Sequence, residues 1–126
     1  MTKAVPGSNV VVLGASTKEE RYSNKAVVML TEYGYKPLPV HPSGNAVHGL
    51  PTAKTLGDIN EQVDTLSMYI GPAISSKAYE SIKTLSPRRI IFNPGSENEE
   101  LAQKLTADGI EVVTACTLVM LRTKSF

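Results

Sequence analysis

Apolar residues are grouped in short uninterrupted runs, and stretches with apolar residues at helical spacing lie between them. The first run, residues 10–13, leads directly into a glycine, which is typical of a buried strand that ends in a tight turn. Similar runs predict strands at residues 35–40, 65–70, 89–92 and 111–113. Because amphipathic stretches separate most of these runs, the pattern predicts a parallel sheet with helices on both faces.

Helices are predicted where apolar residues share one helical face, at residues 22–33, 75–85, 97–108 and 117–121. Small polar residues near the start of three of these segments are candidate N-caps, because their side chains can accept a hydrogen bond from a free backbone N–H. These candidates are Ser23 or Asn24, Ser75, and Ser96 together with Glu99. The last four residues, 123–126, are expected to fray.

The predicted fold class is α/β. A chain of 126 residues with 41% hydrophobic residues is sufficient for one core, so we expect a single Rossmann-like domain over residues 1–126. Its doubly wound sheet would contain five parallel strands. With strands numbered along the chain, right-handed crossovers favour the order 3-2-1-4-5, and the flavodoxin-like order 2-1-3-4-5 is the alternative.

The charge balance and composition exclude several classes of partner. The 13 basic and 12 acidic side chains are dispersed and give a net charge of +1, which argues against bulk electrostatic binding to nucleic acid or to an anionic membrane. No apolar run approaches the ~20 residues that span a bilayer, and the N-terminus lacks the apolar region of a signal peptide. The single cysteine, Cys116, excludes an internal disulfide framework, so a cytoplasmic location is expected. Two histidines without clustered Cys or Asp residues predict no metal site.

Candidate ligand-binding residues follow four of the predicted strands. The carboxyl ends of parallel strands lie on one edge of a sheet, and ligands of open α/β folds bind in the crevice at that edge. Each strand ends in residues that leave room for a flat ligand. The four loops are Gly14-Ala15-Ser16-Thr17, His41-Pro42-Ser43-Gly44, Gly71-Pro72 and Asn93-Pro94-Gly95.

The first loop has the features of an anion site. The backbone N–H groups of residues 15–17 are expected to face an anion, with the dipole of the following helix behind them. Lys18 and Arg21 add positive charge, and an arginine can hold a phosphate through two parallel hydrogen bonds. Glu19 and Glu20 oppose this role unless they face solvent. The loop contains neither G-x-G-x-x-G nor the P-loop pattern.

The second and third loops favour a phosphorylated ribose over NAD. An NAD site usually has Asp or Glu at the end of the second strand, where it binds the ribose hydroxyls. Here Val40, His41 and Pro42 occupy that position, and the next carboxylate is Asp58. After the third strand, residues 69–74 offer an aromatic and apolar surface on which an adenine ring can pack.

Nearly the whole chain resembles the CoA-binding protein family, whose members are stand-alone Rossmann domains similar to the N-terminal domain of the succinyl-CoA ligase α subunit. Two segments carry the most specific part of this resemblance. The first segment is Gly-Ala-Ser at residues 14–16 followed by Arg21, and the second is Gly-Tyr-Lys-Pro-Leu-Pro-Val-His-Pro at residues 34–42. Two departures stand out. The family usually has Asn in place of His41, and its Glu-His after the late cysteine is missing after Cys116.

The resemblance implies CoA or an acyl-CoA as the ligand. Its diphosphate would lie at residues 14–17 and Arg21, and its 3′-phosphoribose and adenine would lie across residues 41–42 and 69–74. The candidate cofactor-binding residues are Gly14, Ala15, Ser16, Thr17, Lys18, Arg21, Ser23, Asn24, His41, Pro42, Tyr69, Gly71, Pro72, Ile74, Asn93 and Pro94.

The leading functional hypothesis is a non-catalytic domain that binds CoA or an acyl-CoA to sense it, carry it or dock it to a protein partner. Only His41 and Cys116 are residues of a catalytic type near strand ends, and nothing in the sequence pairs them, so no catalytic residue is assigned. The alternatives are a small nucleotide-dependent enzyme, a component of an acyl-CoA ligase, and an interaction subunit with an empty site. A mixed disulfide between Cys116 and the CoA thiol is a further hypothesis.

Overall fold

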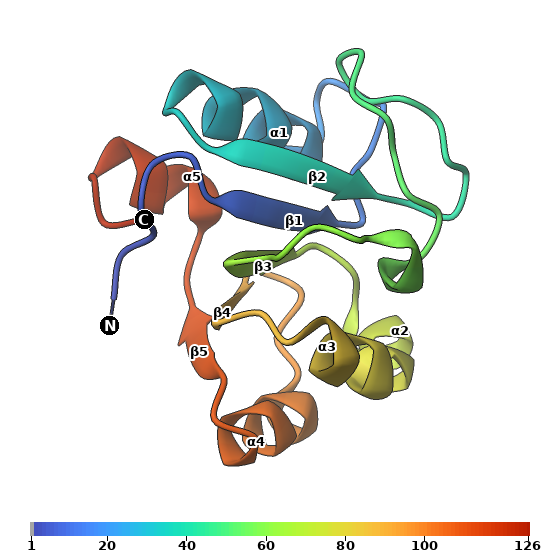
Figure 1. Cartoon of the computed structure of the whole chain (residues 1–126), viewed down its shortest axis with the longest axis vertical. Coiled ribbons are helices and arrows are strands. Elements are labelled where there is room, and N and C mark those ends of the chain that lie inside the picture. The colour runs from blue at the N-terminus through green and yellow to red at the C-terminus, as the bar shows by residue number, and fades with distance from the viewer. Residues whose placement is uncertain (1) are drawn as a thin grey trace.

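The computed structural model of the chain describes residues 2–126 and contains a five-stranded parallel sheet (Figure 1). The strands are β1 (Asn9–Leu13), β2 (Lys36–Val40), β3 (Thr65–Met68), β4 (Arg89–Phe92) and β5 (Glu111–Thr114). Each coincides with a predicted strand to within two residues. The α/β class and the Rossmann-like parallel sheet are therefore confirmed.

The strand order is β2-β1-β3-β4-β5, which is the alternative and not the favoured 3-2-1-4-5 order. β3 pairs with β1, on the side opposite β2. The position outside β2 is taken by Ala53, which forms a single parallel bridge with Val40. The place outside β2 that was expected for the third strand thus holds only a one-residue bridge, and the third strand forms beside β1 instead.

The reason lies in the two prolines of β2. The carbonyl of Pro39 accepts a hydrogen bond from Ala53 N at 3.1 Å, and His41 N donates to Ala53 O at 2.9 Å, so alternate residues of β2 face its outer edge. Pro37 and Pro39 lie on that edge and have no N–H to donate. An extended strand cannot pair there, because two of the required donors are missing.

Helices cover both faces of the sheet (Figure 1). One core contains Val10 and Val12 of β1, packed with residues of α1 and α5, and the other contains Val11 and Leu13, packed with residues of α3 and α4. The helices are α1 (Tyr22–Glu32), α2 (Pro72–Ser75), α3 (Tyr79–Leu85), α4 (Glu99–Ala107) and α5 (Thr117–Arg122), with short 3-10 turns η1 (Leu56–Asp58) and η2 (Ser76–Ala78). No helix within residues 2–126 is long and apolar enough to cross a bilayer.

The predicted N-caps are wrong, although the helices themselves form. The capping positions are Arg21, Gly71 and Asn98, and the Asn98 side chain accepts a hydrogen bond from Leu101 N at 3.1 Å. Ser96 instead donates to Asn93 O at 2.7 Å. The second helical segment begins at Gly71-Pro72, before Ser75, because proline is well suited to the first helical position.

The C-terminal segment does not fray as predicted. Phe126 is 2% exposed, and its ring lies edge-on to the Tyr35 ring at 4.9 Å between centroids. Its carbonyl accepts a hydrogen bond from Ala4 N at 2.9 Å. The last residues therefore close the core formed by α1, α5 and the sheet.

An ion pair at the amino edge of the sheet predicts acid sensitivity. Arg88 Nε lies 2.8 Å from Asp64 Oδ1, and Arg88 Nη2 lies 3.1 Å from Asp64 Oδ2. Burial raises the pKa of Asp64, but hydrogen bonds from Arg88 and Thr65 and the Arg88 charge outweigh burial, so the pKa lies below 3.8. A carboxyl whose pKa is lowered by folding stabilises the fold above its unfolded pKa, and this stabilisation is lost as the pH falls through the folded pKa.

We expect Asp64→Asn to lower the free energy of unfolding at pH 7 by at most about 1 kcal/mol, because solvent screens the partly exposed pair. The variant should also lose part of the decrease in stability that wild type shows as the pH falls from ~5 to ~2. Urea unfolding over this pH range measures both effects. Glu19→Gln, at an exposed position, is the control and should keep the wild-type pH profile. An unchanged profile in Asp64→Asn would contradict the prediction.

Candidate functional site

The carboxyl ends of β1 and β3 form the switch point of the sheet. From β1 the chain continues outward to β2, and from β3 it continues in the opposite direction to β4 and β5. The two connections leave a crevice between the strand ends, which is where open α/β sheets bind ligands. Gly14 follows β1 at this point with φ of +93°, and a Cβ atom there would lie 2.9 Å from Ile70 Cγ2. Only glycine permits this backbone conformation and this close approach.

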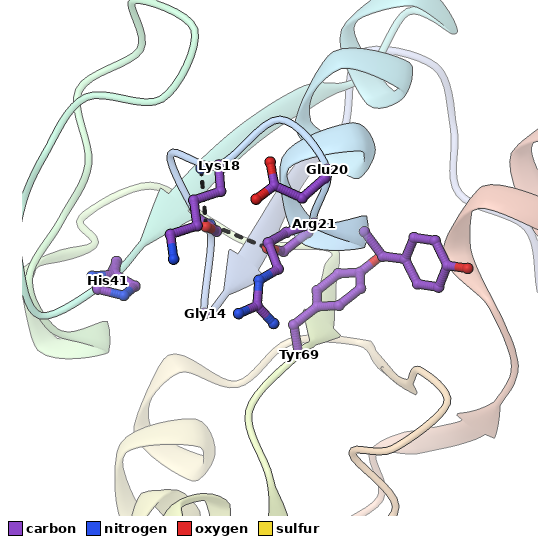
Figure 2. Close-up of a pocket in the computed structure, with 9 residues that line it drawn as sticks. Gly14, Lys18, Glu20, Arg21, His41 and Tyr69 are labelled. Carbon is purple, nitrogen blue, oxygen red and sulfur yellow. Dashed lines mark hydrogen bonds between the residues drawn. The ribbon is translucent and has the colours of Figure 1, made fainter.

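A first cavity of about 560 Å³ opens beside Gly14 and is called the cationic cavity (Figure 2). Its basic side chains, Lys18 and Arg21, extend from the loop into the cavity, and Arg21 points toward Tyr69 (Figure 2). One carboxylate, Glu20, also lines it. The lining residues are Gly14, Ser16, Lys18, Glu20, Arg21, Tyr22, Ser23, His41 and Tyr69.

The N-terminus of α1 supplies free donors to this cavity. Arg21 is the N-cap residue and makes no side-chain cap, and the first hydrogen bond into the helix runs from Lys25 N to Arg21 O at 3.1 Å. The N–H groups of Tyr22, Ser23 and Asn24 precede that bond, so none of them has an intrahelical partner. Together with the helix dipole they favour an anion at this end of α1.

At two of its three predicted positions, the backbone of the first loop does not act as the sequence predicted. Ala15 N donates to Val40 O at 3.2 Å, and Ser16 N donates to Ser23 Oγ at 3.1 Å, so neither N–H is free for an anion. Ser16 Oγ accepts a hydrogen bond from Lys18 N at 3.1 Å, which leaves its hydroxyl hydrogen free to donate into the cavity. The donors of the site are therefore the helix N-terminus and side chains of the loop.

A second cavity of about 480 Å³, called the apolar cavity, lies on the other side of Gly14. It shares Gly14, His41 and Tyr69 with the cationic cavity, so the two adjoin along the carboxyl edge of the sheet. Its lining residues are Leu13, Gly14, Val40, His41, Pro42, Lys54, Thr55, Leu56, Tyr69, Ile70, Ile74, Lys77, Ala78 and Ser81. None of these lining residues is acidic.

Sequence reasoning missed four polar residues of the apolar cavity, Lys54, Thr55, Lys77 and Ser81. Lys54 enters because Ala53 bridges to Val40 and brings the next residue to the strand ends. Lys77 lies in η2 and Ser81 in α3, beyond the loop that follows β3. The only available signal was the position of Lys77 three residues after Ile74, which puts both on one side of a helical turn.

His41 lies at the boundary of the two cavities with a defined tautomer. Its Nδ1 accepts a hydrogen bond from Ser43 N at 3.1 Å and lies 2.9 Å from Ser43 Oγ. A backbone N–H can only donate, so Nδ1 carries no hydrogen and the neutral ring is protonated on Nε2. His41 can therefore offer an Nε2–H donor to a ligand.

Tyr69 contributes its ring to both cavities. Its hydroxyl is buried and has no hydrogen-bond partner within residues 2–126. Burial raises the pKa of Tyr69 to about 12, because it disfavours the phenolate more than the neighbouring Ser67 and Thr117 hydroxyls favour it. Tyr69 is thus neutral near pH 7, and its ring presents an uncharged surface to both cavities.

The structure brings together nine of the sixteen candidate residues and separates the others from the cavities. The residues that line a cavity are Gly14, Ser16, Lys18, Arg21, Ser23, His41, Pro42, Tyr69 and Ile74. Those that line neither cavity are Ala15, Thr17, Asn24, Gly71, Pro72, Asn93 and Pro94. Cys116 is half-buried and also lies outside both.

The side chain of Asn93 makes all of its hydrogen bonds within the protein. It is 2% exposed, its Nδ2 donates to Ser67 Oγ and Met68 O at 2.9 Å each, and its Oδ1 accepts from Thr117 N at 2.8 Å. The side chain thereby caps α5 from the end of β4. Its position after a strand resembles that of a ligand residue, but its hydrogen bonds are those of a structural residue.

We expect Asn93→Asp to lower the free energy of unfolding at pH 7 by at least about 2 kcal/mol, because a buried carboxylate cannot donate to Met68 O and Ser67 Oγ. Urea unfolding measures the loss. The neighbouring exposed residue gives the control, since Pro94→Ala should change stability by less than about 0.5 kcal/mol. If Asn93→Asp were as stable as wild type, the structural role of Asn93 would be wrong.

The fold and the two cavities define a Rossmann-like α/β domain with an anion-favouring crevice at its switch point. A family model described as CoA binding domain matches residues 8–122, and the chain therefore belongs to the CoA-binding domain family.

Several solved structures share this architecture. An uncharacterized protein is 37% identical with a TM-score of 0.86, and the match covers 97% of this chain and 100% of that chain. The cell-free ID.343 protein from Thermus thermophilus is 28% identical with a TM-score of 0.86, over 95% of this chain and 91% of that chain. The dinucleotide-forming acetyl-coenzyme A synthetase 1 of Ca. Korarchaeum cryptofilum, in complex with phosphate and ADP, is 19% identical with a TM-score of 0.75, over 87% of this chain and 26% of that chain. This last likeness is one of fold.

Proposed function

We propose that this protein binds CoA or an acyl-CoA across the two adjoining cavities and acts without catalysing a reaction, as a sensor, a carrier or a docking module for a protein partner. The observation that carries the proposal is the meeting of a cationic cavity and an apolar cavity at Gly14. CoA has the matching chemistry, because its diphosphate connects an adenosine 3′-phosphate to an uncharged pantetheine arm. The family of the chain supports the same ligand.

The diphosphate is assigned to the cationic cavity. The free N–H groups at the start of α1, the Ser16 hydroxyl, Lys18 and Arg21 are all donors, and two of these groups carry positive charge. Glu20 is the only acidic residue in the lining and weakens the field without reversing its sign. Charge-assisted hydrogen bonds of this kind are about twice as strong as neutral ones.

The adenosine 3′-phosphate is assigned to the apolar cavity. Ile74 and the Tyr69 ring provide surfaces for the base, and Lys54 and Lys77 provide charge for the 3′-phosphate. NAD fits less well, because the apolar cavity has no acidic lining residue to bind its ribose hydroxyls.

A non-catalytic role fits the side chains at the cavities. A nucleophile or base needs a partner that activates it. The acceptor nitrogen of His41, Nδ1, is hydrogen-bonded to Ser43. Its ring borders the cavities and has no carboxylate partner among the described residues. Cys116 lines neither cavity. Transfer chemistry on the CoA thiol would then belong to another protein.

A component of an acyl-CoA ligase is the second candidate. The fold likeness to the Ca. Korarchaeum acetyl-coenzyme A synthetase covers 87% of this chain but only 26% of that enzyme, so an activity of this kind would require further domains. Affinity purification of the tagged chain in the presence of CoA, followed by an acyl-CoA ligase assay of the eluate, tests this role. Activity that depends on the chain supports it, and a chain that purifies alone and inactive contradicts it.

Arg21 is expected to contribute directly to CoA affinity. We expect Arg21→Ala to weaken CoA binding by roughly 1–3 kcal/mol, about 5- to 150-fold in Kd, because a charge-assisted contact to the diphosphate is lost. Isothermal titration calorimetry of wild type with CoA, NAD, NADP and ATP measures the reference affinity and the ligand preference. Arg122→Ala removes the same charge from an exposed position on α5 and should bind CoA like wild type. Wild-type binding of NAD without binding of CoA would refute the proposed function.

Lys77 is expected to recognise the 3′-phosphate. Lys77→Ala should weaken binding of CoA several-fold more than binding of dephospho-CoA, which lacks that phosphate, since a single phosphate–lysine contact contributes about 1 kcal/mol. Parallel calorimetric titrations of both ligands into both proteins give the comparison. Lys83→Ala, in the last turn of α3 and outside both cavities, is the matched control. Equal losses for the two ligands would place the 3′-phosphate elsewhere.

A further inference from the structure

A tight hairpin in the connection after β2 lies against the first loop. Val47 and Leu50 form an isolated antiparallel bridge, with hydrogen bonds of 3.2 Å from Val47 N to Leu50 O and 2.9 Å from Leu50 N to Val47 O. The two residues between them, His48 and Gly49, both have positive φ, +49° and +77°. Val47 is 1% exposed and packs in the same core as Ala15. The hairpin is therefore anchored beside the loop that lines the cationic cavity.

The side chain of His48 completes a chain of hydrogen bonds that ends on this loop. His48 Nε2 lies 2.6 Å from Asn24 Oδ1, and Asn24 Nδ2 donates to Ser16 O at 2.8 Å. The N–H of Ser16 is held at the same time by Ser23 Oγ. Both backbone polar groups of Ser16 are thus bound to side chains at the start of α1, and His48 holds one of these side chains, Asn24, in place.

The direction of each bond in this chain is determined. The carbonyl of Ser16 can only accept, so the atom of Asn24 facing it is the NH₂ group, and the other side-chain atom is the oxygen. That oxygen can only accept, so His48 must donate from Nε2. Asn24 is 3% exposed, and loss of the His48 donor would leave its oxygen buried without that partner.

The residue type at position 48 is not the one that this turn prefers. A two-residue hairpin with positive φ at both central positions strongly prefers Asn-Gly. Here the sequence is His-Gly, so histidine replaces the preferred asparagine, although histidine is also enriched among residues with positive φ. A residue other than the preferred one is expected at a turn where its side chain makes a needed contact. The hydrogen bond to Asn24 is such a contact.

We propose that His48 is a positioning residue for ligand binding, which holds Asn24 and through it Ser16 in the geometry that the phosphate-binding loop requires. The inference rests on the proposed function, because Ser16 offers its hydroxyl to the diphosphate. Preorganisation of this kind contributes to affinity by removing the cost of ordering the loop when the ligand binds. His48 itself lines neither cavity.

Two substitutions at position 48 separate positioning from stability. His48→Asn creates the preferred Asn-Gly turn but has a shorter side chain that stops short of Asn24. His48→Gln is disfavoured in the turn but carries an amide donor at a reach similar to that of histidine. The preferred Asn-Gly turn should offset the lost hydrogen bond to Asn24, so we expect His48→Asn to unfold near the wild-type temperature. It should bind CoA about five-fold more weakly, the effect of one hydrogen bond. His48→Gln should be less stable than His48→Asn and yet bind CoA more tightly.

The experiment measures melting temperature and CoA affinity of the three proteins, together with ¹H–¹⁵N spectra of the ligand-free chains. In His48→Asn, the Asn24 side-chain NH₂ and the Thr17 amide, which belongs to the peptide of the Ser16 carbonyl, should shift. In His48→Gln they should return toward their wild-type positions. This opposite ranking of stability and affinity would support the inference, because a purely structural role changes both in the same direction.

Affinities that follow the melting temperatures, or His48→Asn spectra that match wild type at Asn24 and Thr17, would overturn the inference. The wild-type titration separates this failure from failure of the proposed function. If wild type binds CoA and His48→Asn binds it equally well, only the role of His48 is wrong. If wild type does not bind CoA, the proposed function is wrong, and the role of His48 in ligand binding is overturned with it.

Discussion

The contact between the ends of β1 and β3 at Gly14 is the constraint on which the site depends. Gly14 N donates to Val40 O at 2.9 Å, and Tyr69 N donates to Leu13 O at 2.9 Å. The carboxyl ends of β2 and β3 are therefore both hydrogen-bonded to the end of β1 at this turn. The space that a side chain at residue 14 would need is taken by Ile70. Both cavities adjoin this point, one on each side. A larger residue here would separate the strand ends and change both cavities together.

The anion-favouring character of the site comes from the start of α1 more than from the loop before it. The loop uses Ala15 N and Ser16 N to hold itself to β2 and to α1. These two N–H groups are therefore not available to a ligand, but their hydrogen bonds order the loop before a ligand binds. The remaining donors are the free N–H groups at the uncapped helix N-terminus and the side chains of Lys18 and Arg21, and this ordered loop holds them in position. A preformed site of this kind favours affinity over adaptability.

Most of the fold was predictable from the sequence, but the use of each polar side chain was not. The five strands follow from continuous apolar runs, and the ends of α1 follow from a loop before it and from Gly34, which has φ of +92° after the helix. Ser23 and Asn24 are residue types that often cap helices, but their side chains hydrogen-bond to Ser16 in the preceding loop. Asn93 had the position of a ligand residue, and it caps α5 instead. In each case the partner comes from another element, and sequence patterns do not specify such partners.

The sequence by itself determined the class of the fold, the position of the turn at Gly14 and the basic residues near it, because these depend on local periodicity and on the special backbone of glycine. Tertiary structure decided the strand order, since the missing donors of Pro37 and Pro39 prevent pairing only on the side of β2 that faces outward. It also decided that Lys54 and Lys77 share a cavity and that His48 supports Ser16. These residues come from segments far apart in the chain, and only the folded geometry brings them together.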